Sequence, residues 1–153
     1  MPAGGFTAIL AHMSESHTHN QLEEGLDLML QFDKRGGLLP VIVQNSSDGR
    51  ILMLGYADQQ AVAMTLETGH AAFFSTSRKT HWIKGETSGD RLEVEELLVD
   101  CDQDALVYRV RMLGSGVCHT KKPDGSSRSS CFYRRLRPGQ PVLEFVPERD
   151  AQG

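Results

Sequence analysis

Two short runs of β-prone residues flank a turn signal, and this pattern constrains the fold more than any other feature. The runs are Val41-Ile42-Val43 and Ile51-Leu52-Met53-Leu54, and Asn45-Ser46-Ser47-Asp48-Gly49 separates them. Branched and apolar side chains favour strands, whereas Asp-Gly favours a tight reversal of the chain. The sequence therefore predicts a hairpin, and with it a sheet whose neighbouring strands run antiparallel.

Local patterns predict the other elements. Apolar residues at helical intervals predict an amphipathic helix from Asn20 to Gly36-Gly37. These apolar residues are Leu22, Leu26, Met29 and Leu30. A short helix is predicted over residues 58–67, before Gly69. Strands are predicted over residues 71–74, 92–99 and 105–112, and another around residues 132–136. A polar loop is predicted over residues 75–90. We therefore predict an α+β fold with a largely antiparallel sheet and about two helices.

The length of 153 residues suits one domain, and the composition excludes several classes of protein. The formal net charge of −4 argues against a general nucleic-acid binder, which needs a basic surface. No apolar run reaches the ~18 residues that a membrane span requires. We expect a flexible tail over residues 1–19, a single domain over residues 20–153, and a cytoplasmic protein with no membrane or nucleic-acid partner.

The chain has three cysteines, and an odd number does not suit a disulfide framework. Cys101, Cys118 and Cys131 are therefore buried thiols, a reactive thiol or metal ligands. Thiolate and imidazole are ligands of zinc, and His119 directly follows Cys118. If His119 is a ligand, the site is closed and structural. If it is not, three thiolates leave a position for a water that the metal acidifies, and His119 is free to act as general acid or base.

Three carboxylates stand within the five residues Asp100-Cys101-Asp102-Gln103-Asp104, at the end of a predicted strand. Such carboxylates repel one another unless a cation or a basic group lies between them. Alternation along a strand would place Asp100 and Asp102 on one face and Cys101 on the other. This favours an oxygen site for a hard cation such as Mg²⁺, separate from a thiolate site. The alternative is a solvated acidic turn between two antiparallel strands.

Residues 75–89 are rich in hydroxyl groups, glycine and cationic side chains, which are groups that hold phosphate. The segment lacks the Gly-Lys-Ser/Thr ending of a Walker loop. A local basic cluster late in the chain suggests a phosphorylated small molecule rather than nucleic acid. Its members are Lys121, Lys122, Arg128, Arg134, Arg135 and Arg137. The alternative is a charged surface that only keeps the domain in solution.

Together, these segments resemble the phosphoribosyl-AMP cyclohydrolases of histidine biosynthesis. The resemblance spans about residues 38–133, and its matching segments are residues 55–56, 66–69, 75–78, 82–89, 100–104, 118–120 and 130–133. It implies hydrolysis of the N1–C6 bond of 1-(5-phosphoribosyl)-AMP. This opens the purine ring to a formimino-carboxamide ribotide, the third step of the pathway. The expected substrate is a nucleotide with two phosphate-bearing riboses.

The resemblance also implies an intertwined homodimer with zinc and magnesium. Zinc would bind Cys101 of one chain together with Cys118 and Cys131 of the other. The implied Mg²⁺ ligands are Asp100, Asp102 and Asp104. His119 matches the functional histidine of the family and is expected to manage the proton transfers when water attacks C6. The substrate contacts that we assign to the polar loops are Ser75, Ser77, Arg78, Trp82, Lys84, Glu86, Thr87 and Ser88.

The sequence departs from the family between Cys118 and Cys131, where it is longer than usual. Pro123-Asp124-Gly125 predicts a tight turn, so we expect the extra residues to bulge into solvent. Two other functions fit parts of the pattern. One is a zinc-stapled dimer that binds nucleotides without turnover. The other is a zinc nucleobase deaminase, whose His-x-Glu and Pro-Cys-x-x-Cys motifs are absent from the sequence.

Overall fold

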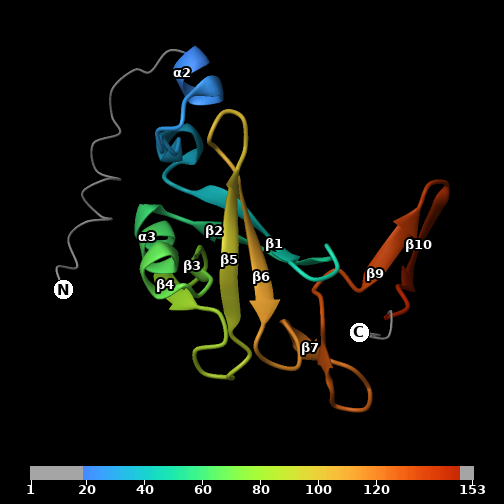
Figure 1. The fold of residues 1–153 in the computed structure, drawn as a ribbon. Helices are drawn as coiled ribbons and strands as arrows, with labels where there is room; N and C mark the ends of the chain where they lie inside the picture. Colours follow the sequence, from blue (N-terminus) through green and yellow to red (C-terminus); the bar gives the residue numbers. More distant parts are fainter. Residues whose placement is uncertain (1–18, 149–153) are drawn as a thin grey trace.

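The computed structural model describes residues 19–148 of the chain (Figure 1). Its central element is a four-stranded sheet with the strand order β2-β1-β6-β5. These strands are β1 (Leu39–Asn45), β2 (Ile51–Ala57), β5 (Leu92–Val99) and β6 (Leu106–Met112). The β1–β6 pair is parallel, and the two outer pairs are antiparallel. The predicted α+β fold with a largely antiparallel sheet is therefore confirmed.

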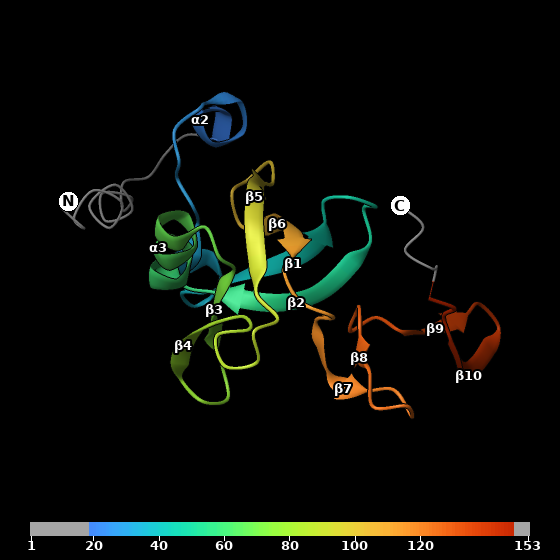
Figure 2. The same cartoon turned by 60° about the horizontal axis from the view of Figure 1, so that its bottom comes forward.

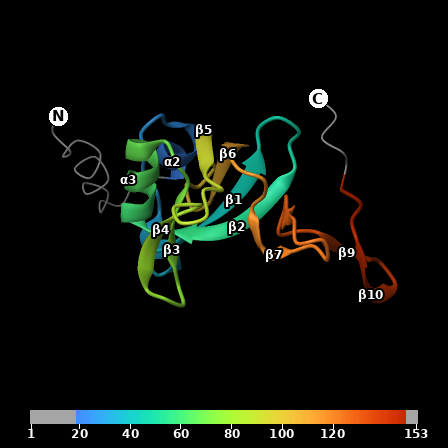
Figure 3. The same ribbon diagram turned by 90° about the horizontal axis from the view of Figure 1, so that it is seen from below.

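Two-stranded sheets and short helices surround this sheet. The strand pairs are β3 (Ala72–Ser75) with β4 (Thr80–Ile83), β7 (Cys118–Lys121) with β8 (Ser127–Arg128), and β9 (Arg134–Arg137) with β10 (Gln140–Phe145). The helices are α2 (His19–Glu24), α3 (Gln59–Thr68) and the 3₁₀ helix η1 (Phe32–Arg35). Helix α3 and the β3–β4 hairpin lie together beside the sheet (Figure 2), and β9–β10 projects away from it (Figure 3).

Local sequence signals account for most of these elements. The predicted hairpin is confirmed as β1 and β2, and the predicted short helix as α3. The Asp58 carboxylate caps α3 by accepting a 2.8 Å hydrogen bond from the backbone N–H of Ala61. Gly69 ends the helix with φ of 72°, a left-handed conformation that glycine adopts without strain. The strands predicted over 71–74, 92–99 and 105–112 are confirmed as β3, β5 and β6.

The prediction of one amphipathic helix between Asn20 and Gly36 is wrong. Helix α2 ends at Glu24, and Gly25, a poor helix former, follows it. The chain then continues without regular helical structure to η1, which Gly36 closes with φ of 67°. The tail predicted over residues 1–19 lies outside the described residues except for His19, which begins α2.

A contact with Gln103 explains why the helix does not continue. The backbone N–H of Met29 donates to Oε1 of Gln103 at 2.7 Å, and the N–H of Gln31 donates to the Gln103 carbonyl at 2.8 Å. These donors are therefore unavailable to a helical ladder. Met29 and Leu30 are both buried while Leu26 is fully exposed, so the apolar periodicity does not match the burial.

The sequence also predicted too few strands. The polar loop predicted over 75–90 contains β4, whose Trp82 packs with its ring centroid 5.0 Å from that of Phe73. The strand predicted around residues 132–136 corresponds in part to β9, while β7, β8 and β10 were not predicted. Strands β7 and β8 are short and polar, and β10, which contains Pro141, is exposed along its whole length. None of them therefore shows the apolar alternation that marks a half-buried strand. Among residues 19–148, no helix is long and apolar enough to cross a membrane.

The hydrophobic core lies between one face of the central sheet and the layer formed by α3 and β3. Its buried residues from the sheet are Leu39, Val41, Val43, Leu52, Met53, Ala57, Leu92, Leu106, Tyr108 and Val110. Val62 of α3 and Phe73 of β3 pack against them. The core thus fixes the position of the β3–β4 hairpin relative to the sheet. The polar segments at residues 75–90 and 100–104 lie in or near the turns at the ends of these strands.

Tyr108 makes the stability of this core depend on pH. Its side chain is fully buried, and its phenol oxygen accepts a hydrogen bond from the Thr65 hydroxyl at 3.4 Å. Burial raises the pKa of Tyr108 to about 12. Because this value exceeds the ordinary pKa of about 10, the neutral phenol stabilises the folded state. This contribution to the free energy of unfolding is fully present below pH 10 and is lost as the pH rises to 12. The loss amounts to at most about 3 kcal/mol.

We therefore expect Tyr108→Phe, which has no ionisable group, to flatten the fall in Tm between pH 10 and pH 12. Thermal unfolding across this range, followed by circular dichroism, measures the effect. The half-buried Tyr133 serves as the control, since Tyr133→Phe is expected to lose Tm with pH as the wild type does. An equally steep fall in the Tyr108→Phe variant would contradict the assignment.

Candidate functional site

Cys118 and Cys131 come together beside β2. Cys118 begins β7 and is buried. The backbone N–H of Cys131 donates to the carbonyl of Leu52 at 2.7 Å, which fixes this segment against β2. The Cys118 sulfur lies 3.0 Å from the Thr120 hydroxyl and is close enough to the Cys131 thiol for the two to interact. The structure thus brings together two of the three cysteines that the sequence analysis assigned to zinc.

The two thiols differ in how readily they ionise. Burial opposes ionisation of Cys118, but hydrogen bonds from Thr120 and Cys131 outweigh it and lower the pKa of Cys118 below its ordinary value. Desolvation and the neighbouring Cys118 sulfur raise the pKa of Cys131 to about 11. The pair therefore loses its second proton much less readily than its first. A divalent cation would stabilise both thiolates, and such a sulfur donor set suits zinc.

Cys101 lies far from this pair within one chain. It is exposed and follows β5, at one end of the β5–β6 hairpin, whereas Cys118 comes after β6, at the other end. Strand β6 has seven residues and therefore extends over about 20 Å. In the part of the chain that the structure describes, no group of three metal-ligating side chains includes a cysteine. A site with all three thiolates therefore requires Cys101 of another chain.

His119 follows Cys118 on β7, and its side chain is exposed. Because Cys118 is buried and His119 is exposed, the imidazole lies on the solvent side of β7 and the Cys118 sulfur does not. This favours the open three-thiolate site over the closed one with His119 as fourth ligand. The imidazole is accessible to a substrate or to water.

The three aspartates gather in the turn between β5 and β6. One carboxylate oxygen from each of Asp100, Asp102 and Asp104 lies within 4.8 Å of the others. Asp100 accepts hydrogen bonds from the backbone N–H groups of Asp104 at 2.8 Å and Ala105 at 3.0 Å, which closes the turn. A turn, and not alternation along a strand, therefore brings the carboxylates together. Their oxygens are ligands that Mg²⁺ prefers.

Two cations that the sequence analysis did not single out contact these aspartates. Lys34 Nζ lies 2.5 Å from Asp102 Oδ2 and 2.9 Å from Asp104 Oδ2, and Arg35 lies 3.3 Å from Asp104 Oδ2. The Lys34 ammonium holds the pKa of Asp104 at about 2. Since 68 residues separate Lys34 from Asp102, no local pattern indicated this contact.

Ser75, Ser77 and Arg78 meet in the turn between β3 and β4. The backbone N–H of Arg78 donates to the Ser75 hydroxyl at 3.2 Å, and the hydroxyl oxygens of Ser75 and Ser77 are 3.4 Å apart. Hydroxyls and a guanidinium in one exposed turn suit an anion. Trp82 differs from these residues because its ring packs on Phe73 at the edge of the core.

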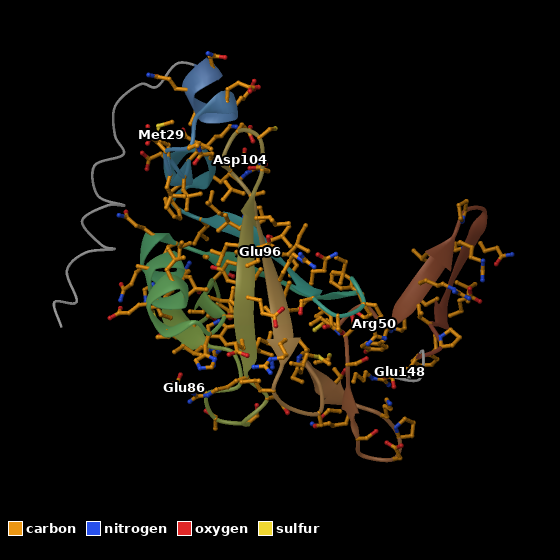
Figure 4. The ribbon with its side chains drawn as sticks, viewed as in Figure 1. Met29, Arg50, Glu86, Glu96, Asp104 and Glu148 are labelled. Carbon is orange, nitrogen blue, oxygen red and sulfur yellow. The ribbon has the colours of Figure 1, made fainter. Side chains whose placement is uncertain are left out.

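The turn over residues 84–90 contacts the loop that leads to Cys118, through Asp90 and Ser115. The positive charge of Lys84 acts on the thiol of Cys131, and Glu86, Thr87 and Ser88 are exposed. Figure 4 shows Glu86 and Asp104 at opposite ends of the molecule. Within one chain, the turn assigned to the substrate therefore lies at the same end of the molecule as Cys118 and Cys131, while the aspartates lie at the same end as Cys101.

Gly85 holds this turn in place. It has φ of 78°, and a Cβ atom there would come within 2.2 Å of the Asp90 backbone. Oδ1 of Asp90 in turn accepts a hydrogen bond from the Ser115 backbone N–H at 3.1 Å, in the loop that leads to Cys118. The close packing at Gly85 thus ties the turn to the loop that carries the cysteine.

We expect Gly85→Ala to destabilise the chain by about 2–4 kcal/mol, because it combines a left-handed backbone with a steric clash. Gly89→Ala is the matched control, since Gly89 has φ of 83° but no atom within 4 Å of the added Cβ. It should cost only about 1–2 kcal/mol. Chemical unfolding of both variants measures the difference, and equal free energies of unfolding would refute the packing argument.

The segment between Cys118 and Cys131 forms the β7–β8 hairpin. The predicted tight turn is confirmed, because the backbone N–H of Gly125 donates to the Lys122 carbonyl at 2.9 Å. Residues 123–126 are all exposed. The turn therefore bulges into solvent, as expected, and leaves Cys118 and Cys131 close together.

Comparisons with known proteins agree on one family. The family model described as phosphoribosyl-AMP cyclohydrolase matches residues 53–133, just over half of the chain. Phosphoribosyl-AMP cyclohydrolase of Solibacter usitatus is 47% identical over 79% of this chain and 91% of its own length. The enzyme of Hyphomonas neptunium is 45% identical over 84% of this chain and 90% of its own length. That of Rhizobium leguminosarum is 43% identical over 87% of this chain and 86% of its own length. With the cysteines, the aspartates and the polar turns arranged as described, this chain belongs to the phosphoribosyl-AMP cyclohydrolase family.

Proposed function

We propose that this chain is a zinc-dependent phosphoribosyl-AMP cyclohydrolase of histidine biosynthesis that hydrolyses the N1–C6 bond of 1-(5-phosphoribosyl)-AMP. The family match supports the activity. The observation that carries the zinc part is that the Cys118 and Cys131 thiols lie near enough to interact, with the charge of Lys84 acting on Cys131. It unites metal-ligating thiols with a cationic turn suited to phosphate.

Zinc would be held by Cys118 and Cys131 of one chain and by Cys101 of another, and it would supply Lewis acidity that activates a water molecule. His119, exposed beside Cys118, would take up or deliver the proton as the N1–C6 bond breaks. Ribosylation of N1 makes C6 electrophilic, so the site needs no further activation of the ring.

The homodimer in this proposal is supported by an apolar row on the outer face of the central sheet. In the strand register, Ile42 lies opposite both Leu54 and Val107, and Val107 lies opposite Leu98. Leu54, Ile42 and Leu98 are each at least 36% exposed. A second copy that covered this face would remove the apolar row from water. It would also provide the Cys101 that the cysteine pair lacks.

The polar turns would bind the substrate's two phosphate groups. Arg78 with Ser75 and Ser77 offers one anion site, and Lys84 with the exposed Thr87 and Ser88 offers another. Mg²⁺ at the aspartates would orient the substrate or neutralise its charge. We further propose that residues 20–153 act as one domain. Reduced thiols are needed throughout, and this favours a cytoplasmic location.

The test is incubation of the full-length protein, loaded with Zn²⁺, with 1-(5-phosphoribosyl)-AMP while its ultraviolet absorbance is followed. Ring opening changes the chromophore, so we expect a steady absorbance change that stops when a chelator removes the zinc. AMP is the matched control, because it lacks the N1 ribosyl group and should give no change. Binding of the substrate without an absorbance change would overturn the proposed activity.

A further inference from the structure

We propose that Lys34 is a built-in cation of the aspartate triad, and that a divalent cation binds Asp100, Asp102 and Asp104 only by displacing its ammonium group. The inference rests on the Mg²⁺ site of the proposed function and adds to it a competitor from the chain itself. It concerns how readily the site fills, and it does not depend on turnover.

The geometry places the ammonium group among the carboxylates. Lys34 Nζ contacts Asp102 at 2.5 Å and Asp104 at 2.9 Å, and both carboxylates belong to the triad in which one oxygen from each aspartate lies within 4.8 Å of the others. Mg²⁺ needs its oxygen ligands at about 2.0–2.1 Å in an octahedral arrangement. A metal ion that close to the same carboxylates would repel the ammonium strongly, so the two cations exclude one another.

Gln103 fixes the segment that carries Lys34. Its backbone has φ of 56°, and its side chain is almost fully buried. Its amide group accepts from the Met29 N–H at 2.7 Å and donates to the carbonyls of Leu22 at 3.3 Å and Asp27 at 3.1 Å. Figure 4 shows Met29 and Asp104 at the same end of the molecule. The residue between two of the aspartates thus anchors the arm that delivers the competing cation.

The Lys34 ammonium group is nevertheless able to move away from the aspartates. Its side chain is 49% exposed, whereas that of Asp104 is only 7% exposed. The flexible four-carbon stem allows the ammonium to swing into water without a change in the Gln103 contacts. Arg35, at 3.3 Å from Asp104, adds a second positive charge at the rim. The triad therefore holds its own cation in the absence of metal, and metal binding has to overcome that ion pair.

Mn²⁺ is the probe for this site because its paramagnetic resonance signal reports free ion directly. We expect the full-length protein, with its thiolate site first loaded with Zn²⁺, to bind Mn²⁺ at least about tenfold more tightly as Lys34→Gln than as wild type. Lys122→Gln is the matched control, since Lys122 pairs with Glu148, away from the triad, and should bind as wild type does. Asp102→Asn combined with Lys34→Gln should abolish the tight binding.

Each outcome decides one part of the inference. Equal Mn²⁺ affinity in wild type and Lys34→Gln overturns the competition but leaves the metal site standing. No binding by either protein overturns the metal site as well. Neither result bears on the cyclohydrolase activity, which the absorbance assay tests separately.

A measurement on the wild-type protein covers the case in which the variant does not fold. Acylation of Lys34 by an amine-reactive reagent, quantified by mass spectrometry, should increase when Mn²⁺ is added, because the displaced ammonium leaves the carboxylates for solvent. Acylation of Lys122 should not change. Equal labelling of Lys34 with and without Mn²⁺ would overturn the displacement.

Discussion

Replacement of His119 by alanine is expected to lower kcat by about 10²–10⁴-fold, the range that positioned acid–base groups contribute. The zinc content should remain at the wild-type level, because the imidazole lies on the exposed side of β7 and Cys118 on the buried side. Rate measurements with the absorbance assay, together with metal analysis of the same samples, give both values.

His119→Asn is the companion variant. Asparagine retains hydrogen-bonding capacity but cannot carry a proton between groups, so it should lose as much activity as alanine does. Activity near the wild-type level in either variant would remove His119 from the mechanism. Loss of zinc from both variants would instead make His119 a ligand, as in the closed site with three cysteines.

Serine at any one of the three cysteine positions is expected to abolish both zinc binding and turnover, with residual activity below about 1% of wild type. A hydroxyl does not ionise at neutral pH as a thiol bound to metal does, so the site loses one of its three anionic ligands. The variants are Cys101→Ser, Cys118→Ser and Cys131→Ser, and zinc analysis after dialysis with the activity assay measures the effect.

Ser126→Ala provides a control for this series, because it alters the exposed turn between Cys118 and Cys131 without touching a sulfur. It should keep both zinc and turnover. The result for Cys101 is the most informative of the three. A Cys101→Ser protein with full zinc content would show that Cys118 and Cys131 hold the metal without it.

The elements that the sequence predicted correctly depend on short-range patterns. The β1–β2 hairpin follows from an Asp-Gly turn between β-prone runs, and α3 follows from an N-cap at Asp58 and a glycine at its end. The N-terminal helix failed because Gln103, more than 70 residues away in the chain, takes the backbone donors of Met29 and Gln31. No local pattern contains such a contact.

The candidate site likewise has parts that local motifs predict and parts that depend on contacts between distant segments. The Cys118-His119 and aspartate segments stand out as sequence motifs, and the pairing of Cys118 with Cys131 agrees with the ligand set expected from them. The ion pair between Lys34 and the aspartates could not be predicted, because it depends on how the N-terminal arm folds back over the β5–β6 turn. The distance between Cys101 and Cys118 likewise follows from the length of β6 and not from the spacing of the cysteines.

Mixing of two inactive variants tests the shared metal site most directly. Cys101→Ser and Cys118→Ser chains are unfolded together, refolded and loaded with zinc. A mixed dimer has one site with Cys101 from the second variant and Cys118 and Cys131 from the first, so all three thiolates are present there. Random pairing of equal amounts should therefore restore about a quarter of wild-type activity. A mixture as inactive as its two components would contradict a zinc site shared between chains.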